Sequence, residues 1–428
     1  MKKFLLMFLC FGGMLMATQL KHIQINGVNI PVIYEKQSNL PLFHLQIIFK
    51  GAGGVSNAKS YGLSDVTSSL LNEGTKKLGV TKFANQLEQK ALNLSVESGF
   101  ETMSFILSGM SYEYKSGMLY LKELMQDPNF TQNALSKVKE NSLISILEKE
   151  NDFDYQASRA LSTMLFKGSA LEFPMSGTKE SIQKISLEEV QKFYKNHIQL
   201  KSAIIVAGGD LEFEELEKSI KEVLGEISSG KEVEIAPIRV SEDKGQKRQL
   251  KETKQAYIYF GAPFYVKDLQ KESAKAKVAS FVLGGGGFGS RIMEEIRVKR
   301  GLAYSANMRL IPGKTLSYAM GYLQTSLKNE KEAQKIVQEV VNEFLQNGIT
   351  QKELDEAKAY LLGSEPLRNE TLSQRLNASF NNYYKNLPLE FDSKVLEEIK
   401  ALSLEEVNNY IKEHKEIGNL TFSIISAD

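Results

Sequence analysis

A segment near the middle of the chain repeats near its end. The sequence SLEEVQKFYKNH begins at Ser186 and SLEEVNNYIKEH begins at Ser403, an offset of 217 residues (403 minus 186). Each copy is soon followed by an apolar run ending in aspartate, AIIVAGGD and LTFSIISAD. Upstream, Thr131-Gln132 and Thr350-Gln351 keep a similar offset of 219 residues (350 minus 131), as do two LEF triplets. Four matches in one order indicate a duplicated unit.

The duplication constrains the fold. Each unit of about 200 residues has a usual domain size, and Gly, Ser, Pro and charged residues gather in 226–248, the expected boundary. We expect an N-terminal domain over 18–235 and a homologous C-terminal domain over 236–428. In each, strand-like runs (43–53, 255–264) precede long amphipathic helices (131–150, 330–348) and a closing strand. This order predicts an α+β fold, two sandwiches of mostly antiparallel sheet packed with helices, and not a doubly wound sheet.

The N-terminal stretch differs in composition from the rest of the chain. Lys2 and Lys3 precede the uncharged run FLLMFLCFGGMLMA, which ends at Ala17. Because this run is too short to span a bilayer comfortably, we expect residues 1–17 to be a cleavable signal and the protein to be periplasmic. An uncleaved anchor is the alternative. Cys10 is the only cysteine, so the mature chain would have no disulfide and no thiolate nucleophile.

The charge of the chain is nearly balanced. It has 53 Lys plus Arg against 52 Asp plus Glu, so there is no global basic field of the kind that attracts nucleic acid. We therefore expect no nucleic-acid partner.

The stretch GLSDVTSSLLNEGT, residues 62–75, predicts an amphipathic helix. A helical wheel places Asp65, Ser68, Ser69 and Asn72 on one face and leucines mostly on the other. Zinc requires His, Cys or carboxylate ligands that converge, and hydroxyls or amides are poor substitutes. The histidines of the chain are scattered, so no metal site is expected here.

The second unit carries LGGGGFGSRIMEEIRVKRGLAYSANMRL, residues 283–310. Three glycines fit G-x-G-x-x-G, but the strand and the later acidic residue of a dinucleotide site are not evident. We expect the glycine run to be a flexible or close-packed connection between helices. Gly301 is expected to end a helix, so that Tyr304 begins an extended segment.

Arg297 and Tyr304 flank this helix end. A guanidinium and a phenol held together can both donate hydrogen bonds to a carbonyl oxygen and stabilise an oxyanion developing on it. The alternative is structural, with Arg297 on a helix surface and Tyr304 packed in a strand.

Together the two segments resemble the pitrilysin/insulinase family of zinc peptidases, in the short-chain branch that includes processing peptidases, over essentially the whole mature chain. Active relatives carry H-x-x-E-H in the frame G-L-A-H-x-x-E-H-x-x-x-x-G-T. Here the flanking glycines match, but Asp65, Ser68 and Ser69 stand at the first histidine, the catalytic glutamate and the second histidine. The family's third ligand, a glutamate, falls near Ser145, with Glu140 and Glu148 on either side. The resemblance thus implies a degenerate zinc motif.

The second segment, residues 283–310, resembles the same family and matches it at the functional positions. Family members carry Arg and Tyr with six residues between them, and the pair contacts substrate near the scissile bond, so the resemblance assigns this role to Arg297 and Tyr304. It implies one half of a clamshell, a non-catalytic subunit that pairs with a homologous subunit carrying zinc and the general base. The expected substrate is a peptide or an unfolded protein segment, for which first-unit edge strands would supply backbone pairing. Zinc is expected in the partner, and no cofactor in this chain.

Two alternatives stay open. In the first, the chain is a purely structural or assembly subunit without a role in proteolysis. In the second, it is an independent metallopeptidase that uses Asp65 with another acid and a different metal. The sequence also leaves open whether the isolated chain forms homodimers.

Overall fold

The computed structural model describes residues 18–57 and 60–427. The expected signal, residues 1–17, lies outside the described residues, so its cleavage and the periplasmic location stay predictions. Within the described part of the chain, none of the helices combines the length and the hydropathy needed to cross a bilayer.

The first half of the chain builds a six-stranded sheet in the order β1-β2-β6-β3-β5-β4. Only the contact between β2 and β6 is parallel. Its strands are β1 Gln19–Ile25, β2 Val28–Lys36, β3 Leu42–Lys50, β4 Asn93–Ser98, β5 Thr102–Met110 and β6 Ala203–Gly209. Its helices are α1 Leu63–Leu71, α2 Gly79–Glu88, α3 Tyr114–Gln126, α4 Gln132–Glu150, α6 Lys179–Lys184, α7 Leu187–His197 and α8 Phe213–Leu224. They bury one face of the sheet in a continuous apolar core.

The second half builds a five-stranded sheet in the order β7-β11-β8-β10-β9, in which only β7 and β11 are parallel. Its strands are β7 Gln246–Leu250, β8 Gln255–Pro263, β9 Ala303–Ile311, β10 Tyr318–Ser326 and β11 Thr421–Ser426. Its helices include α9 Leu269–Ser280, α10 Arg291–Met293, α11 Glu330–Asn347, α12 Gln351–Gly363, α14 Phe391–Ala401 and α15 Leu404–Glu413. The chain thus has the expected fold, two mixed, mostly antiparallel sheets packed with helices.

The two halves share a topology as well as a sequence repeat. The strand that comes last in the sequence of each half, β6 or β11, lies inside its sheet. It runs parallel to one neighbour and antiparallel to the other. The repeated SLEE begins a helix in both halves. Ser186 and Ser403 each cap the third backbone N–H of their helix, and the glutamate there bonds back to the serine N–H. The repeat therefore encodes a helix start.

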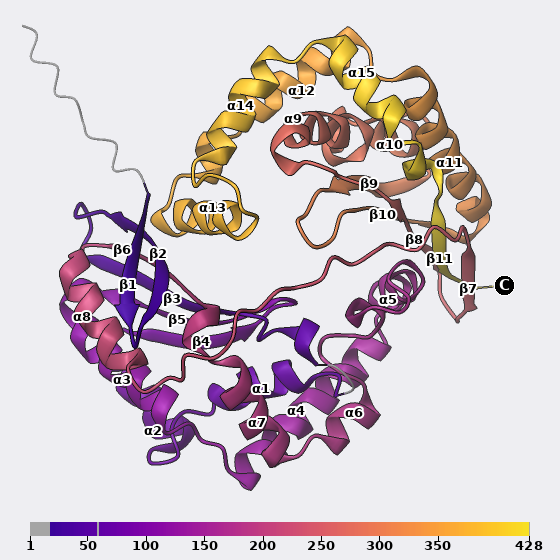
Figure 1. Cartoon of the computed structure of the whole chain (residues 1–428). Coiled ribbons are helices and arrows are strands. Elements are labelled where there is room, and N and C mark those ends of the chain that lie inside the picture. The colour runs from indigo at the N-terminus through magenta and orange to yellow at the C-terminus, as the bar shows by residue number, and fades with distance from the viewer. Residues whose placement is uncertain (1–17, 58–59, 428) are drawn as a thin grey trace, which may run out of the picture.

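Each half also covers the sheet of the other half. Helix α5, Phe153–Leu165, belongs to the first half of the chain but packs on β8 and β11. Helix α13, Leu372–Tyr384, belongs to the second half but packs on β2 and β6 (Figure 1). Leu376 of α13 closes a small core with Ile33, Ile48 and Val206 of the first sheet. The exchange of helices ties the two halves together.

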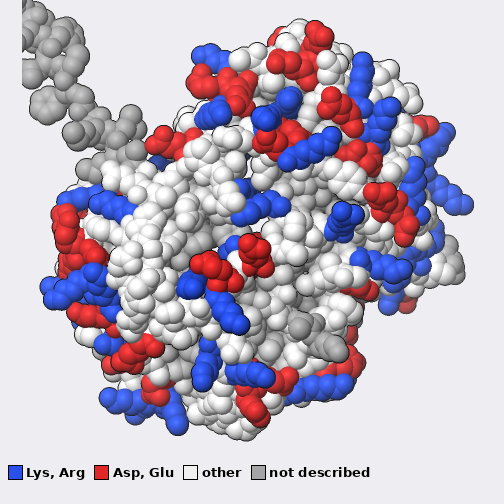
Figure 2. Space-filling model, in the orientation of Figure 1, with Lys and Arg blue, Asp and Glu red and all other residues white. Residues whose placement is uncertain are grey.

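Charged side chains are distributed without one dominant sign. On the face shown in Figure 2, Lys and Arg are interspersed with Asp and Glu, and a broad uncharged area lies over the strands of the first sheet. Leu20 of β1, Leu42 of β3 and Leu40 just before β3 are exposed apolar residues of this sheet.

Candidate functional site

Helix α1 keeps the frame of the zinc-peptidase motif. Gly62 precedes the helix with φ 91° and Gly74 follows it with φ 77°, both in the left-handed region that favours glycine. A Cβ on Gly62 would lie 2.6 Å from the Cδ1 of Ile182, so the position also requires the absence of a side chain. Leu70 and Leu71 are fully buried in the first core. The flanking residues of the motif thus serve folding and packing.

The three chemical positions of the motif differ in their surroundings. Asp65 and Ser69 line a cavity of about 270 Å³, and Ser145 of α4 lines its other side. Ser68 instead turns inward, with 4% of its surface exposed, and its hydroxyl donates to the Asp65 carbonyl at 2.9 Å. A helical wheel groups Ser68 with the polar residues of α1, but it cannot show that this small hydroxyl is buried and bonds its own helix. Ser145, the residue nearest the expected third-ligand position, lines this cavity together with Asn141 and Ser142, whereas Glu140 and Glu148 do not.

The cavity lining does not fit zinc. Its only carboxylates are Asp65 and Glu73, and Glu73 already pairs with the Lys137 ammonium at 2.9 Å. Serine hydroxyls, an asparagine amide and the Lys149 ammonium complete the polar lining, and an ammonium repels a metal cation. Burial raises the pKa of Asp65, and the charge of Lys149 offsets part of this rise. Within 18–57 and 60–427, no three His, Cys, Asp or Glu residues are grouped to hold a metal ion.

The glycine run of the second half is a close-packed connection. After α9 the chain passes through a π-helical turn, Phe281–Gly285, and a short 3-10 turn, Gly287–Gly289, before α10. A Cβ on Gly284 would lie 2.3 Å from the backbone nitrogen of Met308 in β9. Glycine is therefore required where this turn touches the strand.

Arg297 and Tyr304 lie next to each other in space. Arg297 belongs to the π-helical turn Glu294–Val298, and Gly301 (φ 60°) ends this helical segment before β9 begins at Ala303. The Cζ of Arg297 lies 4.3 Å from the ring centre of Tyr304 and 4.6 Å from that of Phe288. The guanidinium is thus held by two aromatic rings.

Both rings are exposed on the surface. Tyr304 has 81% of its surface exposed and Phe288 has 65%. Among the described residues, no hydrogen bond or ion pair engages the side chain of Arg297 or Tyr304. Contact with ring faces does not use the N–H donors of a guanidinium, which lie in its own plane. The group therefore presents unused donors beside a phenol, which is an arrangement suited to a carbonyl oxygen.

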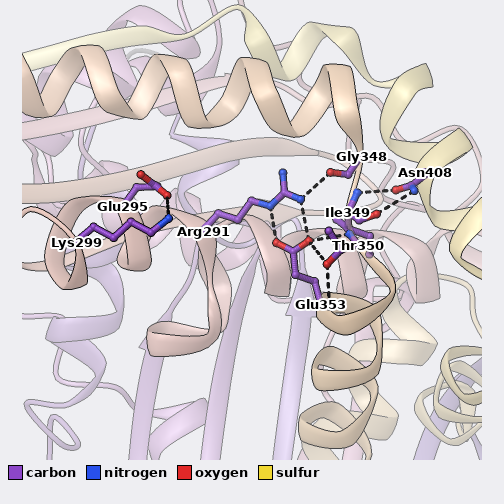
Figure 3. Close-up of polar contacts among 8 residues, drawn as sticks. All are labelled: Arg291, Glu295, Lys299, Gly348, Ile349, Thr350, Glu353 and Asn408. Carbon is purple, nitrogen blue, oxygen red and sulfur yellow. Dashed lines mark hydrogen bonds and ion pairs between the residues drawn. The ribbon is translucent and has the colours of Figure 1, made fainter.

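A polar network fixes the helical segment that carries Arg297. Arg291, one helical turn and a half earlier, donates to both carboxylate oxygens of Glu353 at 2.6 and 2.8 Å and to the Gly348 carbonyl at 2.8 Å (Figure 3). Glu353 in turn accepts from the backbone N–H and the hydroxyl of Thr350 at the start of α12. On the same segment Lys299 pairs with Glu295 at 2.5 Å. Arg297 is thus presented from an anchored helix.

Sequence reasoning missed Phe288. It is the one large side chain in the run GGGGFG. A single bulky aromatic residue within a glycine-rich connection was the signal that the sequence offered. Periodicity could not place it against Arg297, because the intervening turns are irregular.

Comparisons with known proteins agree with this architecture. Residues 184–361 match the family model described as Peptidase M16 inactive domain. The Non-peptidase homolog YmxG of Helicobacter pylori is 45% identical over 428 residues, covering 100% of this chain and 99% of that protein. The solved structure of a peptidase M16 inactive domain from Pseudomonas fluorescens has a TM-score of 0.85 at 24% identity, covering 96% and 98% of the two chains. A protease from Helicobacter pylori has a TM-score of 0.80 at 15% identity, covering 96% and 100%.

The fold and the altered helix α1 define a peptidase scaffold that lacks the residues for zinc and for the general base. The chain belongs to the peptidase M16 family, and its residues 184–361 match the inactive-domain model of that family. The family expected from the sequence is therefore confirmed.

Proposed function

We propose that this chain is the non-catalytic subunit of a periplasmic two-protein M16 peptidase. A homologous partner supplies zinc and the general base, and the two chains enclose a peptide or an unfolded segment between them. Arg297 and Tyr304 of this chain contact a backbone carbonyl of that peptide. The observation that carries the proposal is the half-buried Arg297 guanidinium, which contacts the exposed rings of Tyr304 and Phe288 and has no hydrogen bond or ion pair among the described residues.

The contrast between the two halves supports this division of labour. Helix α1 has lost the chemical residues but kept its packing, so the first half contributes architecture. The second half presents a polar pair on a segment anchored by Arg291 and Glu353. A pre-positioned donor of this kind stabilises developing charge without reorganising at the moment of reaction. Such a donor can come from a second chain if the interface fixes its geometry.

The relatives support the existence of a partner. The organism of the 45% identical non-peptidase homologue, Helicobacter pylori, also has a protease with the same fold. An organism with both kinds of chain has the two components that the proposal requires. The candidate partner for this protein is a homologue with an intact H-x-x-E-H encoded in the same genome.

Substitutions in a reconstituted complex test the proposal. Arg297→Ala is expected to lower kcat/KM for an unfolded polypeptide substrate by about 10²-fold, the effect of losing a preorganised oxyanion donor. Tyr304→Phe removes one hydrogen bond and is expected to cost about tenfold. Phe288→Leu leaves the donors in place but removes one wall of the stack, so a smaller loss is expected.

Two matched variants serve as controls. Arg300→Ala removes an arginine three residues away that pairs with Glu295, and Tyr112→Phe changes a tyrosine of the first half that is 75% exposed. Both are expected to leave activity unchanged. Full activity of the Arg297 and Tyr304 variants, in complexes shown by light scattering to be intact, would favour the assembly role instead.

A further inference from the structure

Strand β4, one of the two edges of the first sheet, is occupied by a side chain that directly follows the degenerate helix. Strand β4 lies at the end of the sheet, so every second residue directs its backbone N–H and C=O away from β5. Asn72, just after α1, bonds to both groups of Val96, the fourth residue of β4. Its Oδ1 accepts from the Val96 N–H at 2.8 Å, and its Nδ2 donates to the Val96 carbonyl at 2.8 Å. The amide of Asn72 thus pairs with Val96 as a neighbouring strand would.

This contact matters because extended peptides bind proteins by adding a strand to such an edge. Strand addition requires the outward N–H and C=O groups of alternate residues. Val96 is an outward residue in the middle part of β4, and both of its groups are already used. The same Nδ2 also donates to the Ser68 carbonyl at 3.0 Å, which fixes the amide against α1. An incoming peptide would have to break two hydrogen bonds at Val96 and displace an amide that is also bonded to Ser68.

Part of strand β9, one of the two edges of the second sheet, is covered in an equivalent way. Strand β9 lies at the end of that sheet. The hydroxyl of Ser280, at the end of α9, accepts from the Leu310 N–H at 3.0 Å. Gly284, one turn later, packs directly on Met308, where a Cβ would lie 2.3 Å from the nitrogen and 2.6 Å from the oxygen. This part of β9 has no room for an added strand.

We propose that this chain does not take up polypeptide by strand addition at β4 or along the 308–310 part of β9, because Asn72 closes the first of these edges and Ser280 with Gly284 closes the second. Peptide is contacted instead through side chains, at the start of β9 where Arg297 and Tyr304 lie. For β4, the proposal replaces the expectation from sequence that first-half edge strands pair with substrate. The closure of these edges rests on contacts within this chain alone, so it stands or fails independently of a zinc-bearing partner, whereas the contact through Arg297 and Tyr304 rests on the proposed function.

Asn72→Ala opens the first edge, and Asn151→Ala is its matched control. Asn151 also follows a helix directly, α4, and also donates to the carbonyl four residues before it, Leu147, at 3.0 Å. Only Asn72 touches a strand. Amide hydrogen exchange of the purified chain should show Val96 exchanging about tenfold faster in Asn72→Ala, the effect of one lost hydrogen bond. Asn151→Ala should leave Val96 unchanged.

Binding of an unfolded probe tests the consequence. Reduced, carboxymethylated lactalbumin, which stays unfolded, should not slow exchange of the Leu94–Ser98 amides in the native chain or in Asn151→Ala. In Asn72→Ala the same probe should protect these amides and bind about tenfold more tightly, because two backbone groups have become available. Asn72→Asp keeps an acceptor for the Val96 N–H but has no donor for its carbonyl, so it should bind the probe with intermediate affinity.

Three results would overturn the proposal. They are protection of the β4 amides by the probe in the native chain, unchanged Val96 exchange in Asn72→Ala, and no gain of probe binding once that exchange is faster. Asn72 is exposed, so its replacement leaves the core intact, and Asn72→Asp provides the same comparison if the alanine variant does not fold.

Discussion

Arg375 of α13 forms an ion pair with Glu35 at the end of β2, two residues that are 340 positions apart in the sequence. Two nitrogens of the guanidinium lie 2.6 and 2.9 Å from Oε1 of Glu35, and Thr18 donates to Oε2 at 2.9 Å. Glu35 is 3% exposed. The pair pins the second half of the chain to the sheet of the first half.

Arg375→Ala is therefore expected to destabilise the whole chain, because it leaves a buried carboxylate without its partner. Since the Arg375 side chain is partly solvated, the expected loss is about 2–4 kcal/mol of unfolding free energy. Urea unfolding followed by circular dichroism measures it, and the chain has no tryptophan for fluorescence. The double variant Glu35→Leu/Arg375→Met should recover part of the loss. A loss below 0.5 kcal/mol on the scale of surface substitutions would show that α13 is held by its apolar contacts alone.

Asp154 has the reciprocal role on α5. Its carboxylate accepts hydrogen bonds from the Tyr259 hydroxyl at 3.1 Å and from the Gln324 side-chain amide, both on the second sheet. Asp154→Ala is expected to speed amide exchange in α5 and in the facing part of β8 by about tenfold, since two contacts across the halves are lost. Exchange in α7, which is remote from this contact, is the internal control. Equal exchange in the variant and the native chain would contradict the role of Asp154.

Asp65 should make the chain less stable near neutral pH. Burial raises its pKa above the ordinary range, and Lys149 offsets only part of this rise. The folded state therefore favours the protonated carboxyl. The contribution of Asp65 to the free energy of unfolding is fully present below its pKa in the unfolded chain, and it is lost as pH rises through its pKa in the folded chain. Asp65→Asn should raise the unfolding free energy at pH 7 by about 1 kcal/mol and should give no gain at pH 3.5. The exposed Asp243→Asn is the control, and a larger gain at low pH would refute the assignment.

Glu353 should show the opposite pH dependence. Burial alone would raise its pKa, but hydrogen bonds from Arg291 and Thr350 hold the pKa below the ordinary range. The contribution of Glu353 to the free energy of unfolding is fully present above its pKa in the unfolded chain. It is lost as pH falls through its pKa in the folded chain. Glu353→Gln should cost about 1–2 kcal/mol at pH 7 and progressively less on acidification below pH 4. The same cost at both pH values would indicate a packing effect.

Much of the fold was predictable because it is encoded locally. The helix starts at Ser186 and Ser403, the long helices α4 and α11, and the closing strands β6 and β11 follow from capping residues and periodicity. The exchange of α5 and α13 was not predictable, since no local signal links Glu35 to Arg375. Long-range pairing is decided by three-dimensional packing, which the periodicity of one segment does not contain.

The candidate site was predictable only in part. The spacing of Arg297 and Tyr304 was visible because a helix end at Gly301 joins them. Phe288 and the buried hydroxyl of Ser68 were not visible, because their contacts depend on irregular turns and on a helix bonding to itself. Asn72 was grouped with the polar face of α1, although its amide reaches a strand edge.

Metal content measured together with activity tests the central claim most directly. The isolated chain and its complex with the candidate partner are analysed for zinc by mass spectrometry and assayed on the same unfolded polypeptide. The account predicts no bound zinc and no hydrolysis for the isolated chain, with zinc and hydrolysis in the complex coming from the partner. Stoichiometric zinc with peptidase activity in the isolated chain, lost in Asp65→Asn, would contradict it.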